Sequence, residues 1–238
     1  IAMVLDVSGS MQSVDFKPNR LAVAVDTIYN FVNDRPQDRI SFIIFAGTAY
    51  TRIPLTLDHA LIRQSLNEVG TESVNEDGTA IGMAISVGLN RLKKSDAASR
   101  IMVLVTDGDN NAGAINPATA SELARDMGVK IYTIGVGTDE TIIPVQVFGQ
   151  IRYQRAEGGL NEELLQQIAQ TTGGQYYRAK DAEALNQIFD NINRLEKSEF
   201  DRDHFKQYTE LAFDLIKAAL ILLVLGIFLD RYYFVQIP

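Results

Sequence analysis

Cysteine is absent from this sequence of 238 residues, and the only histidines are His59 and His204. Without cysteine the chain forms no disulfides, no thiolate metal sites and no cysteine nucleophile. Two histidines leave little room for a histidine-rich metal site or a serine–histidine catalytic pair. Any metal site in this chain must therefore be built mainly from oxygen ligands.

A block of basic residues is also missing. The chain has 22 basic and 30 acidic residues, which gives a formal net charge of −8. An acidic body repels phosphate backbones, so nucleic acid is not an expected partner. Hydrophobic residues make up 46% and charged residues 22% of the chain. This composition predicts a folded protein with a sizeable core, organised as one domain plus a tail or as two small domains.

Apolar runs rich in valine and isoleucine alternate with amphipathic segments over residues 1–197. The runs predict buried strands at 1–6, 39–47, 100–108, 129–137 and 175–178. Apolar residues at helical spacing predict helices at 20–33, 59–69, 79–93, 117–127, 162–171 and 182–197. This alternation predicts an α/β fold with a doubly wound, mostly parallel sheet that is covered by helices on both faces. Residues 143–156 break the rhythm and predict an inserted β-hairpin.

The C-terminal part has a different composition. Residues 211–229 contain only two charged side chains, Asp214 and Lys217, and an aromatic run follows. Nineteen residues at about 1.5 Å each would span roughly 28 Å, close to the hydrocarbon thickness of about 30 Å. We therefore predict a transmembrane helix over 211–234 with a juxtamembrane linker over 198–210. The alternative is an amphipathic helix that docks on the domain.

Hydroxyl and carboxylate side chains gather where predicted strands end. Asp6, Ser8 and Ser10 alternate directly after the first strand. They are hard oxygen donors, which suit Mg²⁺, Mn²⁺ or Ca²⁺ better than zinc or copper. Three groups do not fill six coordination positions, but Thr79 in a D-G-T segment and Asp107 in a T-D-G segment are further donors. Ligands of open α/β sheets bind beyond the carboxyl ends of the strands, so we expect all five side chains to meet there.

Simpler interpretations of these polar segments remain open. Residues 6–10 could form a plain helix-capping loop, since serine is a common capping residue. Residues 109–111 (Asp-Asn-Asn) could hold a second cation, although a solvated turn is the simpler interpretation. We interpret Asp15 as an acid in a loop rather than as a ligand.

Three motifs in this order, D-x-S-x-S, D-G-T and T-D-G, resemble those of the von Willebrand factor A (vWA) domain. The resemblance covers residues 1–197 and implies a Rossmann-like fold with 143–156 as an insertion. It also implies a metal-ion-dependent adhesion site (MIDAS) that uses the five residues named above. In such a site the two serines and the threonine contact the cation, usually Mg²⁺, and the aspartates act largely through water. One coordination position stays open for a Glu or Asp carboxylate from a partner protein.

Longer segments are similar to bacterial BatA-type, or aerotolerance-related, membrane proteins. They are RPQDRISFIIFAGTAYTRIPLT (35–56), EDGTAIGMAI (76–85) and TDGDNNAG (106–113). This resemblance implies a protein-interaction module in an envelope stress or aerotolerance system. The implied partners are other Bat proteins, a MoxR-type AAA+ ATPase and the membrane. The implied location is the bacterial inner membrane, with the vWA domain on the periplasmic side.

A metal-dependent phosphate-ester hydrolase is the alternative function, because α/β sheets with an acid after the first strand often act on phosphate esters. A dehalogenase-type phosphatase needs a second aspartate two residues after the first, and Ser8 occupies that position. The chain also contains no G-x-x-x-x-G-K-[ST], G-x-S-x-G or G-x-G-x-x-G motif at the required place. The sequence therefore favours a binding module over an enzyme.

Overall fold

A six-stranded sheet organises residues 1–197, with the strands in the order β3-β2-β1-β4-β5-β8. The strands are β1 (Ala2–Asp6), β2 (Ile40–Phe45), β3 (Ala49–Thr56), β4 (Ile101–Thr106), β5 (Lys130–Val136) and β8 (Tyr176–Ala179). All neighbours are parallel except β2 and β3. The prediction of a mostly parallel α/β sheet is confirmed, and the antiparallel strand β3 is an element that the sequence analysis missed. Its mixed composition and Pro54 are typical of an edge strand.

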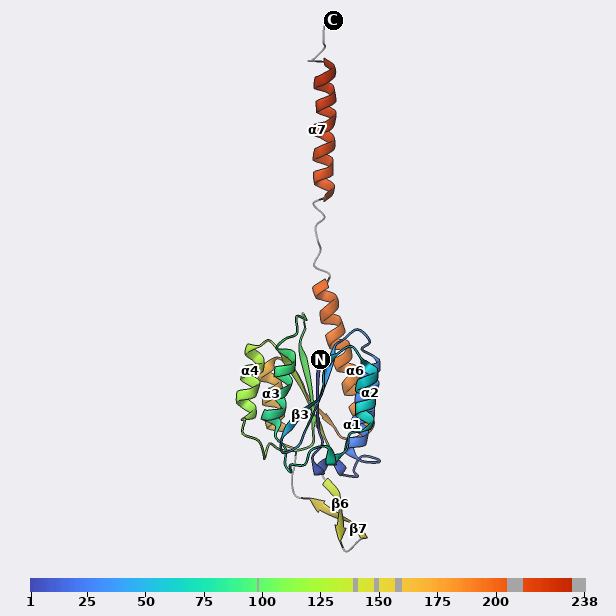
Figure 1. Ribbon diagram of the computed structural model, residues 1–238, viewed down its shortest axis with the longest axis vertical. Helices are drawn as coiled ribbons and strands as arrows, with labels where there is room; N and C mark the ends of the chain where they lie inside the picture. Colours follow the sequence, from blue (N-terminus) through green and yellow to red (C-terminus); the bar gives the residue numbers. More distant parts are fainter. Residues whose placement is uncertain (98, 139–140, 148–149, 157–159, 205–211, 233–238) are drawn as a thin grey trace. The chain divides into compact units, whose positions relative to one another are not determined.

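The structure, a computed structural model, describes residues 1–97, 99–138, 141–147, 150–156, 160–204 and 212–232. Helices cover both faces of the sheet (Figure 1). They are α1 (Arg20–Asn33), α2 (His59–Asn67), α3 (Ile81–Leu92), α4 (Pro117–Asp126), α5 (Glu162–Thr172) and α6 (Ala182–His204). One apolar core lies between the sheet and α1, α2 and α6. The other lies between the sheet and α3, α4 and α5.

The three central strands are buried along their whole length. Every residue of β1, β2 and β4 is buried, which explains why these segments are continuous apolar runs. The chain passes from β1 to β2 and β3 on one side, whereas β4, β5 and β8 follow on the other. The strand order therefore reverses between β1 and β4. In doubly wound sheets this switch point opens the crevice in which ligands bind.

A small second sheet follows the carboxyl end of β5. Strands β6 (Thr141–Val147) and β7 (Gln150–Ala156) pair antiparallel and correspond to the hairpin predicted over 143–156. Strand β6 contacts η1 (Gly9–Gln12), the 3-10 helix that follows β1. The insertion therefore lies at the edge of the main sheet at which β1 ends.

The C-terminal part differs from the prediction at the end of α6. Helix α6 continues past the predicted end at residue 197 as far as His204, so residues 198–204 of the predicted linker are helical. Residues 205–211 lie outside the described part of the chain. Helix α7 (Ala212–Tyr232) follows and, with the end of α6, belongs to a second unit that is separate from residues 1–197.

The predicted transmembrane helix over 211–234 is not supported. None of the helices in the part of the chain that the structure describes is both long and apolar enough to cross a membrane.

Candidate metal-binding site

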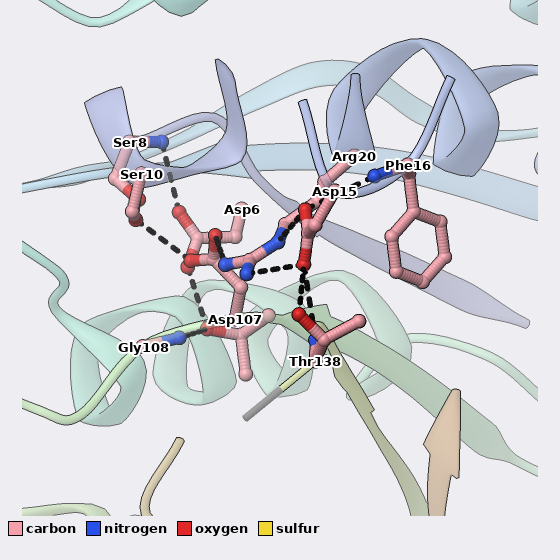
Figure 2. Close-up of polar contacts among 10 residues, drawn as sticks. Asp6, Ser8, Ser10, Asp15, Phe16, Arg20, Asp107, Gly108 and Thr138 are labelled. Carbon is pink, nitrogen blue, oxygen red and sulfur yellow. Dashed lines mark hydrogen bonds and ion pairs between the residues drawn. The ribbon is translucent and has the colours of Figure 1, made fainter. Parts of the chain in front are cut away.

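Asp6 anchors a polar cluster at the switch point between β1 and β4 (Figure 2). It is the last residue of β1 and is fully buried. Its Oδ1 accepts a hydrogen bond of 2.9 Å from the Ser8 N–H, and its Oδ2 accepts one of 2.5 Å from the Thr106 hydroxyl. Thr106 is the last residue of β4. This pair of bonds ties the ends of the two strands together through one carboxylate.

Two serine hydroxyls extend the cluster towards Asp107. The Ser8 and Ser10 Oγ atoms lie 3.0 Å apart, and the Ser10 hydroxyl donates to Asp107 Oδ1 at 2.7 Å. Ser8 precedes η1, but its side chain makes no capping hydrogen bond. The interpretation of residues 6–10 as a plain capping loop is therefore wrong. Both hydroxyls instead belong to the polar cluster.

Thr79, in the loop before α3, lies next to Gly108, the residue that follows Asp107. It is buried, and a Cβ built on Gly108 would lie only 3.1 Å from its Oγ1. The hydroxyl of Thr79 therefore packs against the backbone that follows Asp107. The Asn111 side-chain oxygen accepts a hydrogen bond of 2.8 Å from the Thr79 N–H. Asn111 is exposed, as expected for a turn, but it also holds the Thr79 loop in place, a role that the sequence analysis missed.

The two central carboxylates are poorly stabilised without a cation. Burial and the nearby Asp107 raise the pKa of Asp6 to about 7, against the hydrogen bonds from Thr106 and Ser8. Burial also raises the pKa of Asp107, although the Arg20 guanidinium opposes this shift. A divalent cation between such groups would favour their ionised forms.

The donor set fits a hard cation. Mg²⁺ binds oxygen ligands octahedrally at about 2.1 Å, so adjacent ligand oxygens lie roughly 3 Å apart. The Ser8–Ser10 and Ser10–Asp107 oxygen separations of 3.0 and 2.7 Å agree with that spacing. Within the described residues no group of three or more His, Cys, Asp or Glu side chains could hold a metal. A metal site here would therefore depend on hydroxyl oxygens as well as carboxylates.

Sequence reasoning missed the partners of Asp15. The side chain of Asp15 is 6% exposed and forms a salt bridge with Arg20, with an Oδ2–NH2 distance of 2.6 Å. Asp15 also accepts a hydrogen bond of 3.0 Å from the Thr138 N–H. Burial opposes ionisation of Asp15, but the bonds from Arg20 and Thr138 outweigh it and lower its pKa to about 2. Asp15 lies in a loop, as predicted, but the sequence analysis did not foresee its salt bridge with Arg20 or its bond from Thr138, which is 123 residues away.

The family model described as von Willebrand factor type A domain matches residues 1–191. This chain belongs to the vWA family. The crystal structure of BatB from Bacteroides thetaiotaomicron is similar to this vWA domain, with a TM-score of 0.72 and 29% identity over 82% of this chain and 98% of that one. An aerotolerance-related membrane protein from Bacteroides fragilis gives a TM-score of 0.71 and 29% identity over 81% of this chain and 96% of that one. The resemblance of the vWA domain to Bat-type proteins is thereby confirmed.

The similar sequences match most of this chain, but the relatives themselves are longer than it. An uncharacterized protein of Borreliella burgdorferi is 31% identical over 91% of this chain and 66% of its own length. A UPF0353 protein of Mycolicibacterium gilvum is 29% identical over 81% of this chain and 58% of its own length. The chain thus spans about three fifths to two thirds of the length of these curated relatives.

Proposed function

We propose that this vWA domain binds a divalent cation and uses it to bind a carboxylate of a partner protein. The cation, Mg²⁺ in the first place and Mn²⁺ or Ca²⁺ as substitutes, would be held by Asp6, Ser8, Ser10, Thr79 and Asp107. The observation that carries the proposal is the 2.7 Å bond between Ser10 and Asp107, which are 97 residues apart. It supports a single site at the switch point, the place where α/β sheets bind ligands.

The residues of the cluster have different parts in this proposal. The hydroxyls of Ser8, Ser10 and Thr79 are the direct ligands, because they are neutral and leave most of the cation's charge uncompensated. Both oxygens of Asp6 are already hydrogen-bonded within the protein, so Asp6 acts by orienting the Ser8 loop and by its charge. When bound, the cation supplies the positive charge that attracts a carboxylate to an otherwise acidic chain of net charge −8.

The Bat-type relatives suggest the setting of this interaction. We propose other Bat proteins and a MoxR-type AAA+ ATPase as partners, in an envelope stress or aerotolerance system. The protein from B. fragilis is described as an aerotolerance-related membrane protein, which supports a location at a membrane. We propose the bacterial inner membrane, with the vWA domain on the periplasmic side. The function proposed is interaction and not catalysis.

Isothermal titration with Mg²⁺ and Mn²⁺ tests the site. The protein should bind one cation, and Ser10→Ala should weaken binding by about tenfold or more, since it removes one direct ligand. Ser86→Ala is the matched control, because the Ser86 hydroxyl donates only to the Gly82 carbonyl of its own helix. Absence of cation binding by the unmodified protein would refute the proposal. Turnover of a phosphate ester that is lost in Asp6→Asn would favour the hydrolase instead.

A further inference from the structure

Arg20 is a buried cation beside the proposed metal site, and the function proposed above does not use it. Its side chain is 2% exposed, and it is among the largest fully buried side chains of the described residues. It is the first residue of α1, whose start is fixed by Asn19: the Asn19 side chain accepts a hydrogen bond of 2.7 Å from the Ala22 N–H. Burying a guanidinium is costly unless it is paired on all sides, so its partners show what it does.

The guanidinium of Arg20 lies between two carboxylates (Figure 2). Its NH1 donates to Asp107 Oδ2 at 2.8 Å, while its Nε and NH2 donate to the two oxygens of Asp15 at 2.8 and 2.6 Å. Room for the group exists because residue 137 is glycine, where a Cβ would lie 2.8 Å from the Arg20 Cζ. The position and plane of the charge are therefore fixed by packing as well as by hydrogen bonds.

Asp107 divides its two oxygens between the cation site and Arg20. Oδ1 accepts from the Ser10 hydroxyl, whereas Oδ2 accepts from Arg20. Ionised Asp6, Asp15 and Asp107 together with Arg20 carry a formal charge of −2, which a divalent cation would bring to zero. Without the charge of Arg20 the occupied site would stay at −1 and would repel an incoming carboxylate.

We propose that Arg20 is a positioning residue that sets the ligand preference of the site. It holds one oxygen of Asp107 away from the cation and neutralises part of its charge, so the bound cation keeps its attraction for a partner's carboxylate. Cation affinity is lower as a result. The inference rests on the proposed function, because it concerns the same cation site.

Substitutions of Arg20 and of Asp15 should change the Mn²⁺ and acetate affinities in opposite directions. Arg20→Gln removes a positive charge, so it should tighten Mn²⁺ binding and weaken acetate binding to the Mn²⁺-loaded protein, each by roughly tenfold. Asp15→Asn removes a negative charge next to the same guanidinium and should weaken Mn²⁺ binding and tighten acetate binding. Arg20→Lys keeps the charge and should stay closer to the unmodified protein in acetate affinity than Arg20→Gln. If Arg20 and Asp15 had only a structural role, Arg20→Gln and Asp15→Asn would both weaken the binding of Mn²⁺ and of acetate.

Electron paramagnetic resonance of free Mn²⁺ measures the cation affinity, and water proton relaxation of the Mn²⁺-loaded protein measures acetate binding. Acetamide is the uncharged control and should not discriminate between the variants. If Arg20→Gln does not fold, as judged by circular dichroism, the Asp15→Asn variant still tests whether the Mn²⁺ and acetate affinities change in opposite directions. If Asp15→Asn weakens the binding of both Mn²⁺ and acetate, or changes neither affinity, the inference is overturned and the proposed function is left intact. Failure of the unmodified protein to bind Mn²⁺ overturns both.

Discussion

Replacing the buried carboxylate of Asp6 by an amide should have opposite effects with and without a cation. In the cation-free protein Asp6 has a pKa raised from 3.8 to about 7. An acid whose pKa is higher in the folded state lowers stability as the pH rises from about 4 to about 7, because the unfolded chain releases its proton first. Above that window the folded protein carries the full cost of a buried, ionised Asp6 next to Asp107.

The magnitude follows from the same shift. About three pKa units correspond to an upper limit of about 4 kcal/mol. Asp6→Asn removes this cost, but its amide has a single acceptor oxygen for two donors, the Ser8 N–H and the Thr106 hydroxyl, so one hydrogen bond is lost or must reverse, at a cost of about 2 kcal/mol. We therefore expect the variant to be more stable than the unmodified protein by about 2 kcal/mol near pH 8 in chelator, or about 4–8 °C in Tm for a domain of this size.

Excess Mg²⁺ should reverse the advantage of the variant. A ligand present at a hundredfold excess over its Kd stabilises the folded state by about 2.7 kcal/mol, so the unmodified protein should gain about 5–10 °C in Tm. The Asp6→Asn variant should gain little, since the site loses one of its charges. Thermal denaturation followed by circular dichroism, between about pH 4 and pH 8, measures all of these changes.

Asp109→Asn is the matched control for Asp6→Asn. Asp109 is exposed and bonds to the Asn161 side chain outside the cluster, so the same change of charge should alter neither the pH dependence nor the response to Mg²⁺. A cation-free Asp6→Asn protein that is less stable than the unmodified one at about pH 8 would refute the electrostatic reasoning. An unchanged response of that variant to Mg²⁺ would refute the assignment of Asp6 to the site.

Three further changes test the surroundings of the cluster. Gly137→Ala should destabilise the protein by about 2 kcal/mol or more in denaturant titrations, because Gly137 has a φ of +140° and an added Cβ would meet Arg20; a neutral result would show that Arg20 can move. Asn111→Ala should weaken Mg²⁺ binding several-fold without loss of fold, since Thr79 loses the acceptor for its N–H. Thr79→Val should weaken Mg²⁺ binding about tenfold in calorimetry whereas Thr79→Ser should not, and equal effects would mean that the hydroxyl is not a ligand.

Local sequence patterns determined most of the fold. The continuous apolar runs of β1, β2 and β4 follow from burial on both faces of the sheet, and helix α1 begins and ends where its periodicity predicts. Edge strand β3 was missed because only one of its faces packs against the core, so its residues are partly polar. The long apolar run of the tail predicted a membrane span that none of the described helices supports.

The candidate site divides in the same way. Asp6, Ser8, Ser10, Thr79 and Asp107 were identifiable because each lies in a short polar motif beside a predicted strand or helix. Arg20 and Asp15 carry no such local signal, and the contacts that Thr106 and Asn111 make were not foreseen although both lie in polar segments of interest. Their roles depend on which backbone and side-chain atoms the folded sheet brings within 3 Å of them, over separations of up to 123 residues along the chain. Composition and periodicity thus determined the chain's elements and its oxygen donors, whereas tertiary packing decided the charge balance around them, because electrostatic interactions act through space and depend on burial.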